Sequence, residues 1–137
     1  MNCPVCRETT LEYGPYSRKG VDIYYINCPR CGEFKIPMIL KMNIEDEETD
    51  VFRWVLSHYI RQRQSKNILK LNQKIIDALK DKKLPDPIEQ SENMLREIGD
   101  RIEIPSESIE INGQYFSAVI GAKDSENVDY IGEYLEN

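Results

Sequence analysis

The chain has 137 residues, a hydrophobic fraction of 40% and a formal net charge of −6, which is enough for one ordinary domain or for a small metal module and a helical domain. No stretch approaches the roughly 20 apolar residues of a membrane span, and no apolar signal segment stands before the first cysteine. These features argue against a membrane partner, and we expect a cytoplasmic protein.

The four cysteines form two Cys-x-x-Cys pairs, Cys3/Cys6 and Cys28/Cys31. Two residues between cysteines let both sulfurs of a tight turn point at one ion, and two such turns supply the tetrahedral shell that zinc prefers. A proline stiffens each turn, and Gly32 after the second pair can take a positive φ. Four cysteines leave no position for water, so we expect one structural zinc ion.

Other interpretations of the cysteines fit less well. Two disulfides would suit a secreted mini-protein, but the chain is not rich in cysteine. A redox Cys-x-x-Cys needs a thioredoxin-like setting and no second pair. An iron site of the rubredoxin type has the same four-thiolate geometry, so iron stays open as the alternative ion.

The residues around the cysteines predict a small antiparallel sheet. Residues 11–16 and 21–26 are rich in tyrosine and branched side chains and flank a turn, which favours two strands. Residues 33–36 predict a third strand, which Pro37 stops. A cysteine turn, a hairpin, a second cysteine turn and a strand are typical of a zinc ribbon. A ribbon of this size needs folding energy from the metal.

Two helices are predicted after an acidic stretch at residues 45–50, whose negative charge suits a helix N-terminus. Over residues 52–60, apolar side chains recur at helical spacing, and the cations that follow are favoured at a helix C-terminus. A second helix is predicted from residue 72 to residue 82, and it should bury three apolar residues: Ile75, Ile76 and Leu79.

A third helix has a clear start signal. Asp86 can cap it, Pro87 takes the first helical position and Glu89 the third. This helix is predicted to carry a group of apolar residues with a serine and a methionine beside them: Ile88, Leu95 and Ile98, with Ser91 and Met94.

The tail continues with isoleucines that alternate with polar residues over residues 102–111, followed by an Asn-Gly turn. Residues 115–122 are almost wholly apolar and predict a short buried helix. Asp124 or Ser125 can cap a last helix, which has one apolar face: Val128, Ile131 and Leu135.

The last three helices suggest a helix-turn-helix core. A winged version needs a β-hairpin after the last helix, and none follows, so we expect that a larger protein is cut at about Asn137. The predicted fold class is α+β. A four-cysteine zinc ribbon occupies residues 1–42, and a mostly helical, helix-turn-helix-like domain, truncated at its C-terminus, occupies residues 43–137.

Several motifs appear together in this order: Cys-Pro-x-Cys, Cys-Pro-Arg-Cys-Gly, Trp54…His58-Tyr59-Ile60-Arg61, Leu84-Pro85-Asp86-Pro87, Met94-Leu95 and Tyr134-Leu135-Glu136-Asn137. The order resembles the N-terminal zinc-ribbon plus winged-helix-like regions that precede effector domains in bacterial anti-phage and conflict-system proteins. The resemblance implies a sensor or adaptor region whose effector lies outside this chain. Only the four cysteines carry over residue by residue, as metal ligands.

The charge is strongly segregated along the chain. Residues 51–83 contain nine basic and two acidic residues, whereas residues 84–137 contain three basic and thirteen acidic residues. A local basic segment keeps nucleic-acid binding open in an acidic protein, because cations release counterions from phosphates. The candidate contacts are the basic residues of this segment and of the ribbon hairpin: Arg18, Lys19, Arg53, Arg61, Arg63, Lys66, Lys70 and Lys74.

The first hypothesis is therefore a non-catalytic, zinc-binding recognition or adaptor module that regulates or positions an effector, with nucleic acid as a partner of the basic segment. The competing interpretation is that these cations dock on the acidic parts of the same protein. Residues 125–136 carry no basic residue, so the last helix should be repelled by phosphates and should contact protein instead.

The second hypothesis is a protein-protein interaction or oligomerisation scaffold without a nucleic-acid role, whose partner is another protein or the missing C-terminal domain. An enzyme is the third, and the sequence gives it little support. There is no Ser-His-Asp order, phosphate loop or dinucleotide fingerprint, and the single histidine, His58, is expected to be a packed or surface residue. We predict no catalytic residue and no small-molecule substrate in this segment.

Overall fold

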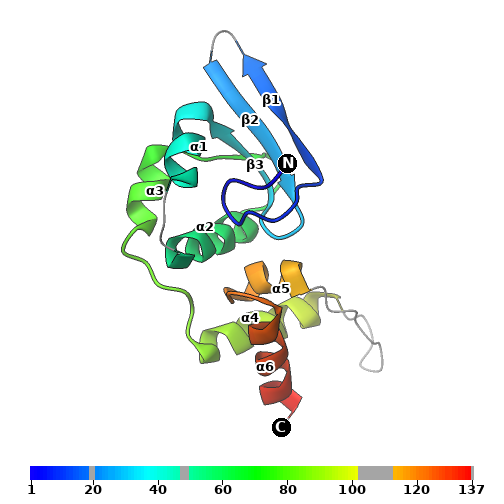
Figure 1. Ribbon diagram of the computed structural model, residues 1–137. Coiled ribbons are helices and arrows are strands. Elements are labelled where there is room, and N and C mark those ends of the chain that lie inside the picture. The colour runs from blue at the N-terminus through cyan, green and yellow to red at the C-terminus, as the bar shows by residue number, and fades with distance from the viewer. Residues whose placement is uncertain (19–20, 47–49, 102–112, 137) are drawn as a thin grey trace.

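The computed structural model describes residues 1–18, 21–46, 50–101 and 113–136. Within these residues the fold is α+β, with four strands and six helices. In chain order they are β1 (Glu12–Arg18), β2 (Val21–Cys28), β3 (Gly32–Pro37), α1 (Met38–Glu45), α2 (Asp50–Gln62), β4 (Leu69–Lys70), α3 (Gln73–Leu79), α4 (Pro87–Arg101), α5 (Gly113–Ile120) and α6 (Ser125–Glu136). Figure 1 shows the sheet at one end of the molecule, α4 to α6 at the other, and α2 between them.

The sheet has the strand order β1-β2-β3-β4. β1 to β3 form an antiparallel meander, in which Cys28 lies opposite Gly32. The three strands predicted from the sequence are confirmed with slightly longer bounds. β4 pairs parallel to β3 and was not predicted, because a strand of two residues has no pattern to read.

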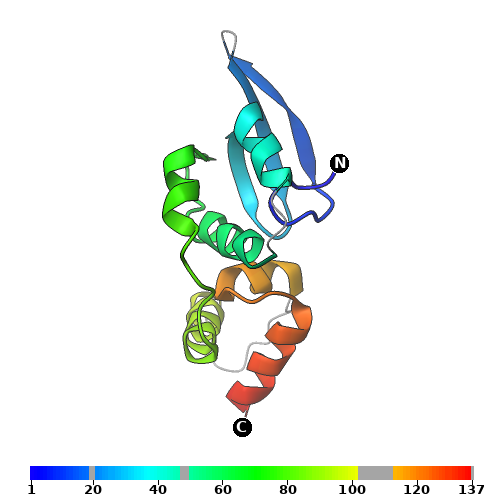
Figure 2. The same cartoon turned by 60° about the vertical axis from the view of Figure 1, so that its left-hand side comes forward.

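α1 was also not predicted. Pro37 ends β3, as expected, and then serves as the N-terminal cap residue of α1 with an extended backbone. Leu40 and Ile44, one helical turn apart, are the buried residues of this helix. Figure 2 shows α1 lying against β2 and β3, so it covers a face of the hairpin that would otherwise be open to water.

The first core continues from the cysteines into the helices. It joins the cysteines and the sheet to α1, α2 and α3 as far as Leu79. Its largest fully buried side chains come from the sheet and from α2 and the segment that follows it: Ile26, Phe34, Ile36, Leu56, Ile60 and Leu71. Residues on both sides of the predicted domain boundary at 42/43 belong to this cluster, because a sheet this small packs against α2 to complete its core. The division into two domains stays a prediction.

The second core joins α4, α5 and α6. Its buried apolar residues are Met94, Phe116, Val119, Ile120, Ala122, Val128 and Ile131. All three helices were predicted, and the expected apolar face of α6 is confirmed. Their classification as a helix-turn-helix remains a prediction.

The buried face of α4 differs from the prediction. Ile88 and Leu95 are 66% and 55% exposed, whereas Gln90, Ser91 and Met94 are buried. The face is rotated because the amide of Gln90 donates hydrogen bonds to two backbone carbonyls. Only the Nε2 of Gln90 is satisfied in this way, since its buried Oε1 has no partner among the described residues. A polar side chain thus takes a core position that apolar periodicity assigns elsewhere.

The predicted helix starts are confirmed by their hydrogen bonds. Asp86 Oδ1 accepts from the backbone N–H of Glu89 at 2.9 Å, and Asp124 Oδ1 accepts from the backbone N–H of Asn127 at 2.9 Å. The isoleucine-rich stretch predicted at residues 102–111 lies outside the described residues. None of the helices that the structure describes is both long and apolar enough to span a membrane.

Candidate metal centre

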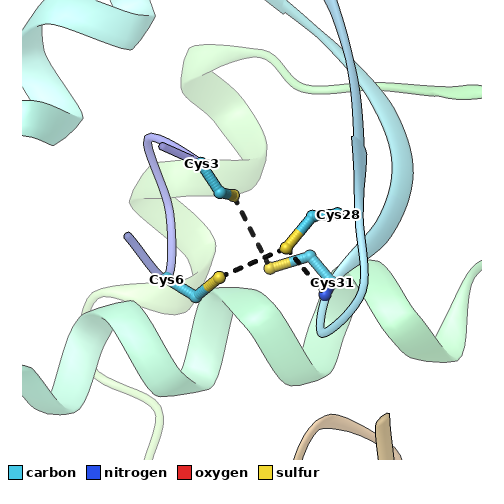
Figure 3. Close-up of side chains that lie close together, drawn as sticks. All are labelled: Cys3, Cys6, Cys28 and Cys31. Carbon is cyan, nitrogen blue, oxygen red and sulfur yellow. Dashed lines mark hydrogen bonds between the residues drawn. The ribbon is translucent and has the colours of Figure 1, made fainter. Parts of the chain in front are cut away.

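The four cysteine side chains meet at one end of the sheet (Figure 3). Cys3 and Cys6 belong to the first cysteine turn (residues 3–8), and Cys28 and Cys31 to the second (residues 28–32). All four are buried, and their sulfur atoms lie within 4.8 Å of one another. The Sγ atoms of Cys6 and Cys28 are 3.3 Å apart, and those of Cys3 and Cys31 are 4.0 Å apart. Four thiolates about 2.3 Å from a tetrahedral ion are separated by about 3.8 Å, so the cluster fits one metal ion.

Backbone hydrogen bonds hold the first cysteine turn closed. The N–H of Arg7 donates to the carbonyl of Cys3, and the N–H of Cys3 donates to the carbonyl of Glu8, both at 2.8 Å. Arg7 has a φ of 66°, which costs a residue with a side chain about 1 kcal/mol. Contacts with the rest of the protein must therefore stabilise this backbone conformation. A metal ion that bridges the first and second cysteine turns would be one such contact.

The second cysteine turn depends on Gly32, which has a φ of 95°, as the sequence predicted. Here the N–H of Cys31 points at Cys28 Sγ at 3.5 Å. Gln64 packs directly over Gly32 and binds the next residue twice. Its Oε1 accepts from the N–H of Glu33 at 2.8 Å, and its Nε2 donates to the carbonyl of Glu33 at 2.9 Å. A Cβ on residue 32 would lie 2.5 Å from Cδ of Gln64, so a larger residue would displace the Gln64 side chain.

The surroundings of the four sulfurs differ. Burial raises the pKa of the Cys3 and Cys31 thiols. Hydrogen bonds from the neighbouring cysteines, first of all Cys3, lower the pKa of Cys28. The buried hydroxyl of Ser57 on α2 lies 3.1 Å from Cys31 Sγ and can donate to a thiolate there. The sequence contains no signal for this role of Ser57, because a serine on an amphipathic helix is common.

Two arginines pack around the second cysteine turn. Arg30 is only 3% exposed; its Nη2 donates to the carbonyl of Ala122 at 2.7 Å, and its guanidinium lies 4.4 Å from the ring centre of Trp54. Arg61 donates from Nε to the carbonyl of Arg30 and from Nη2 to that of Pro29, both at 2.9 Å. Arg61, predicted to contact nucleic acid, thus binds the backbone of the cysteine turn.

Burial lowers the pKa of both Arg30 and Arg61, while the nearby cysteines raise it. Removing a guanidinium from water is costly unless negative charge lies close to it. A divalent ion with four thiolates carries a net charge of about −2, and the two cations would balance that charge. The buried arginines therefore suit a metal-loaded cluster better than four neutral thiols.

The C-terminal end of α5 docks against this region. Helix C-termini leave carbonyls without partners, and here five successive carbonyls accept side-chain hydrogen bonds. The donors come from α2, α4 and the second cysteine turn: His58 to Ala118 at 2.6 Å, Gln62 to Val119 at 2.7 Å, Asn93 to Ile120 at 3.2 Å, Gln90 to Gly121 at 3.0 Å and Arg30 to Ala122 at 2.7 Å. The cysteine turn and the second core are thereby joined directly.

The other predicted nucleic-acid contacts are spread over the surface. Lys66, Lys70 and Lys74 are exposed, and exposed Arg63 stacks on Tyr59 with its guanidinium carbon 3.7 Å from the ring centre. Arg53 is half-buried beside Trp54. The side chain of Arg18 and all of Lys19 lie outside the described residues.

The chain matches no protein-family model, and neither the curated proteins nor the solved structures contain one significantly similar to it. The resemblance to zinc-ribbon plus winged-helix-like regions therefore rests on the motifs in the sequence, and it remains a prediction.

Proposed function

We propose that this chain is a non-catalytic zinc-binding recognition or adaptor module of a larger protein, and that its basic segment 51–83 binds nucleic acid. Cys3, Cys6, Cys28 and Cys31 would hold the zinc ion in the manner of a zinc ribbon. Four thiolates close the coordination shell, so the ion supplies folding energy to the two cysteine turns. Iron is the alternative ion, since the same donor set accepts it.

The observation that carries the nucleic-acid proposal is the lack of acidic partners for the exposed cations. Among the described residues, Lys66, Lys70, Lys74, Lys82 and Lys83 have no carboxylate within ion-pair distance. Lys80 pairs with Asp77 at the end of α3. The acidic helix α6 lies at the opposite end of the molecule from the sheet (Figure 1), whereas Glu89 of α4 lines the same pocket as Lys74, Lys82 and Lys83. None of these five lysines forms an ion pair with a described residue of α4 or α6, and all five are exposed to solvent, where phosphates can reach them.

A second candidate function, a protein-interaction scaffold, is favoured by one feature of α4. Ile88 and Leu95 are seven residues apart on the exposed face of this helix, and exposed apolar pairs at that spacing can pack on a partner helix. Light scattering at increasing protein concentration tests self-association. A strict monomer, together with binding to nucleic acid, would favour the first function.

Titration of the zinc-loaded chain into labelled duplex DNA, single-stranded DNA and RNA tests the proposal. Binding should fall steeply between about 50 mM and about 200 mM salt, and Arg63→Glu with Lys66→Glu should weaken it about tenfold or more. Arg96→Glu with Lys123→Glu is the matched control, because it makes the same charge change at two exposed residues outside the basic segment. Arg61 is unsuitable for charge reversal, since its loss would disturb the cysteine turn. No binding to any of the three at low salt would reject the nucleic-acid function.

A further inference from the structure

A groove lies between α2, α3 and the segment that leads to α4, with a volume of about 710 Å³. Its inner wall is apolar and is formed by buried or half-buried side chains, among them Val55, Ile75 and Leu84. Its lining also includes four exposed cations: Arg63, Lys74, Lys82 and Lys83. Glu89 is the acidic residue of the lining. An apolar wall with a cationic rim fits a ligand that is flat and apolar at its centre and anionic outside.

We propose that this groove binds single-stranded nucleic acid, with unstacked bases against the apolar wall and phosphates on the cationic rim. This inference rests on the proposed function and names its site and its ligand class. The volume is that of a small-molecule pocket, which is enough to take an unstacked nucleotide. A duplex keeps its bases stacked inside and offers mainly phosphates, so it would leave the apolar wall unused.

The stacked pair of Arg63 and Tyr59 supplies a flat surface at the edge of the groove. Its guanidinium lies 3.7 Å from the ring centre, so the free face of the guanidinium can receive a base while its charge meets a phosphate. Bases stack readily on arginine planes as well as on aromatic rings. This arrangement favours a single strand that passes from the Arg63 end toward Lys82 and Lys83.

The polar side chains of the groove are already bonded to the protein. His58 donates to the carbonyl of Ala118, Gln62 donates to that of Val119, and Asn72 caps α3 by accepting from the N–H of Ile75. Sequence-specific reading needs side-chain donors and acceptors that are directed at base edges. With these three engaged elsewhere, binding depends on stacking and charge, and its sequence preference should be weak.

Fluorescence anisotropy with the zinc-loaded full chain tests the groove. Labelled single strands of DNA and RNA should bind about tenfold or more tightly than a duplex of the same length. Lys82→Glu with Lys83→Glu should weaken single-strand binding about tenfold, whereas Lys66→Glu with Lys70→Glu, the same charge change outside the groove, should weaken it about threefold or less. Ala78 is an exposed residue of α3 that lines the groove. Ala78→Trp leaves the charge unchanged and fills the groove, so it should also weaken single-strand binding.

The outcomes separate this inference from the function it rests on. No binding to any nucleic acid would reject both. Binding in which a duplex is equally tight, or in which the groove pair and the control pair act alike, would overturn the groove while leaving a nucleic-acid module. If a poly-glutamate peptide displaces the labelled strand as strongly as the unlabelled oligonucleotide does, the groove recognises negative charge alone. That result would overturn nucleic acid as the ligand class. Circular dichroism of each variant confirms that the fold is retained.

Discussion

Replacing Gly32 by alanine should destabilise the second cysteine turn severely. The residue has a φ of 95°, and a Cβ there would lie 2.5 Å from Cδ and 2.6 Å from Oε1 of Gln64. The Gln64 side chain would have to leave, and its two hydrogen bonds to the backbone of Glu33 would be lost with it. The change therefore acts on the turn that carries Cys28 and Cys31.

The cost can be worked out from these contacts. The left-handed backbone costs alanine about 1–2 kcal/mol, and each lost hydrogen bond costs about 0.5–1.5 kcal/mol. Alanine recovers about 0.4–1 kcal/mol by restricting the unfolded chain. The net loss in the free energy of unfolding is about 2–4 kcal/mol, which is a large part of the total for a domain of this kind.

Urea denaturation of the metal-loaded protein, followed by circular dichroism, measures the loss. Gly14→Ala in β1 is the matched control, since its Cβ would meet no atom within 4 Å, and its effect should stay within about 1 kcal/mol. In the double variant with Gln64→Ala, part of the loss should disappear because the clash is gone. A Gly32→Ala protein as stable as the Gly14→Ala protein would refute the geometry of the turn.

Three further predictions concern the two cores and the junction between them. Arg30→Met removes the charged hydrogen bond to Ala122 and a countercharge of the thiolates, so competition with a chelator should show metal affinity about tenfold lower; an unchanged affinity would speak against the countercharge role. Burial lowers the pKa of the His58 imidazole below its ordinary 6.5. As the pH falls, His58 is therefore protonated in the unfolded chain before it is protonated in the folded chain. The stability that neutral His58 contributes is complete above about pH 6.5 and declines below it. In urea denaturation, the free energy of unfolding of His58→Gln should depend less on pH below about 6.5 than that of the unchanged protein. The same pH dependence in both proteins would contradict a lowered pKa of His58. Met94→Ala, at a side chain 1% exposed, should cost about 2–4 kcal/mol in urea denaturation, against about 0.5 kcal/mol for Leu95→Ala; equal losses would mean that the face of α4 is assigned wrongly.

The features predicted correctly from the sequence are those that short-range chemistry determines. The spacing of the cysteines places both sulfurs of a turn on one side, and Asp86 and Asp124 cap the helices that follow them because the bond spans three residues. Gly32 takes the left-handed backbone for the same local reason. Each of these signals is complete within a few residues of the chain.

The features that the sequence missed depend on contacts between distant residues. Arg61 sits in a basic segment, yet it binds the carbonyls of Pro29 and Arg30. Arg30 reaches a carbonyl 92 residues away in the chain, and such bonds leave no periodic pattern. Gln90 lies on the core side of α4, where its amide donates to the carbonyl of Gly121, directly after α5. Only the assembled fold decides which polar residues are used up internally and which face solvent.

Native mass spectrometry of the chain, purified without added reductant, tests the metal centre most directly. We predict one zinc ion on each chain, with the four cysteines as thiolates and no disulfide. One iron ion would keep the four-thiolate centre and reject zinc. A metal-free chain, or a mass lowered by the hydrogens lost in forming two disulfides, would contradict a metal centre formed by Cys3, Cys6, Cys28 and Cys31.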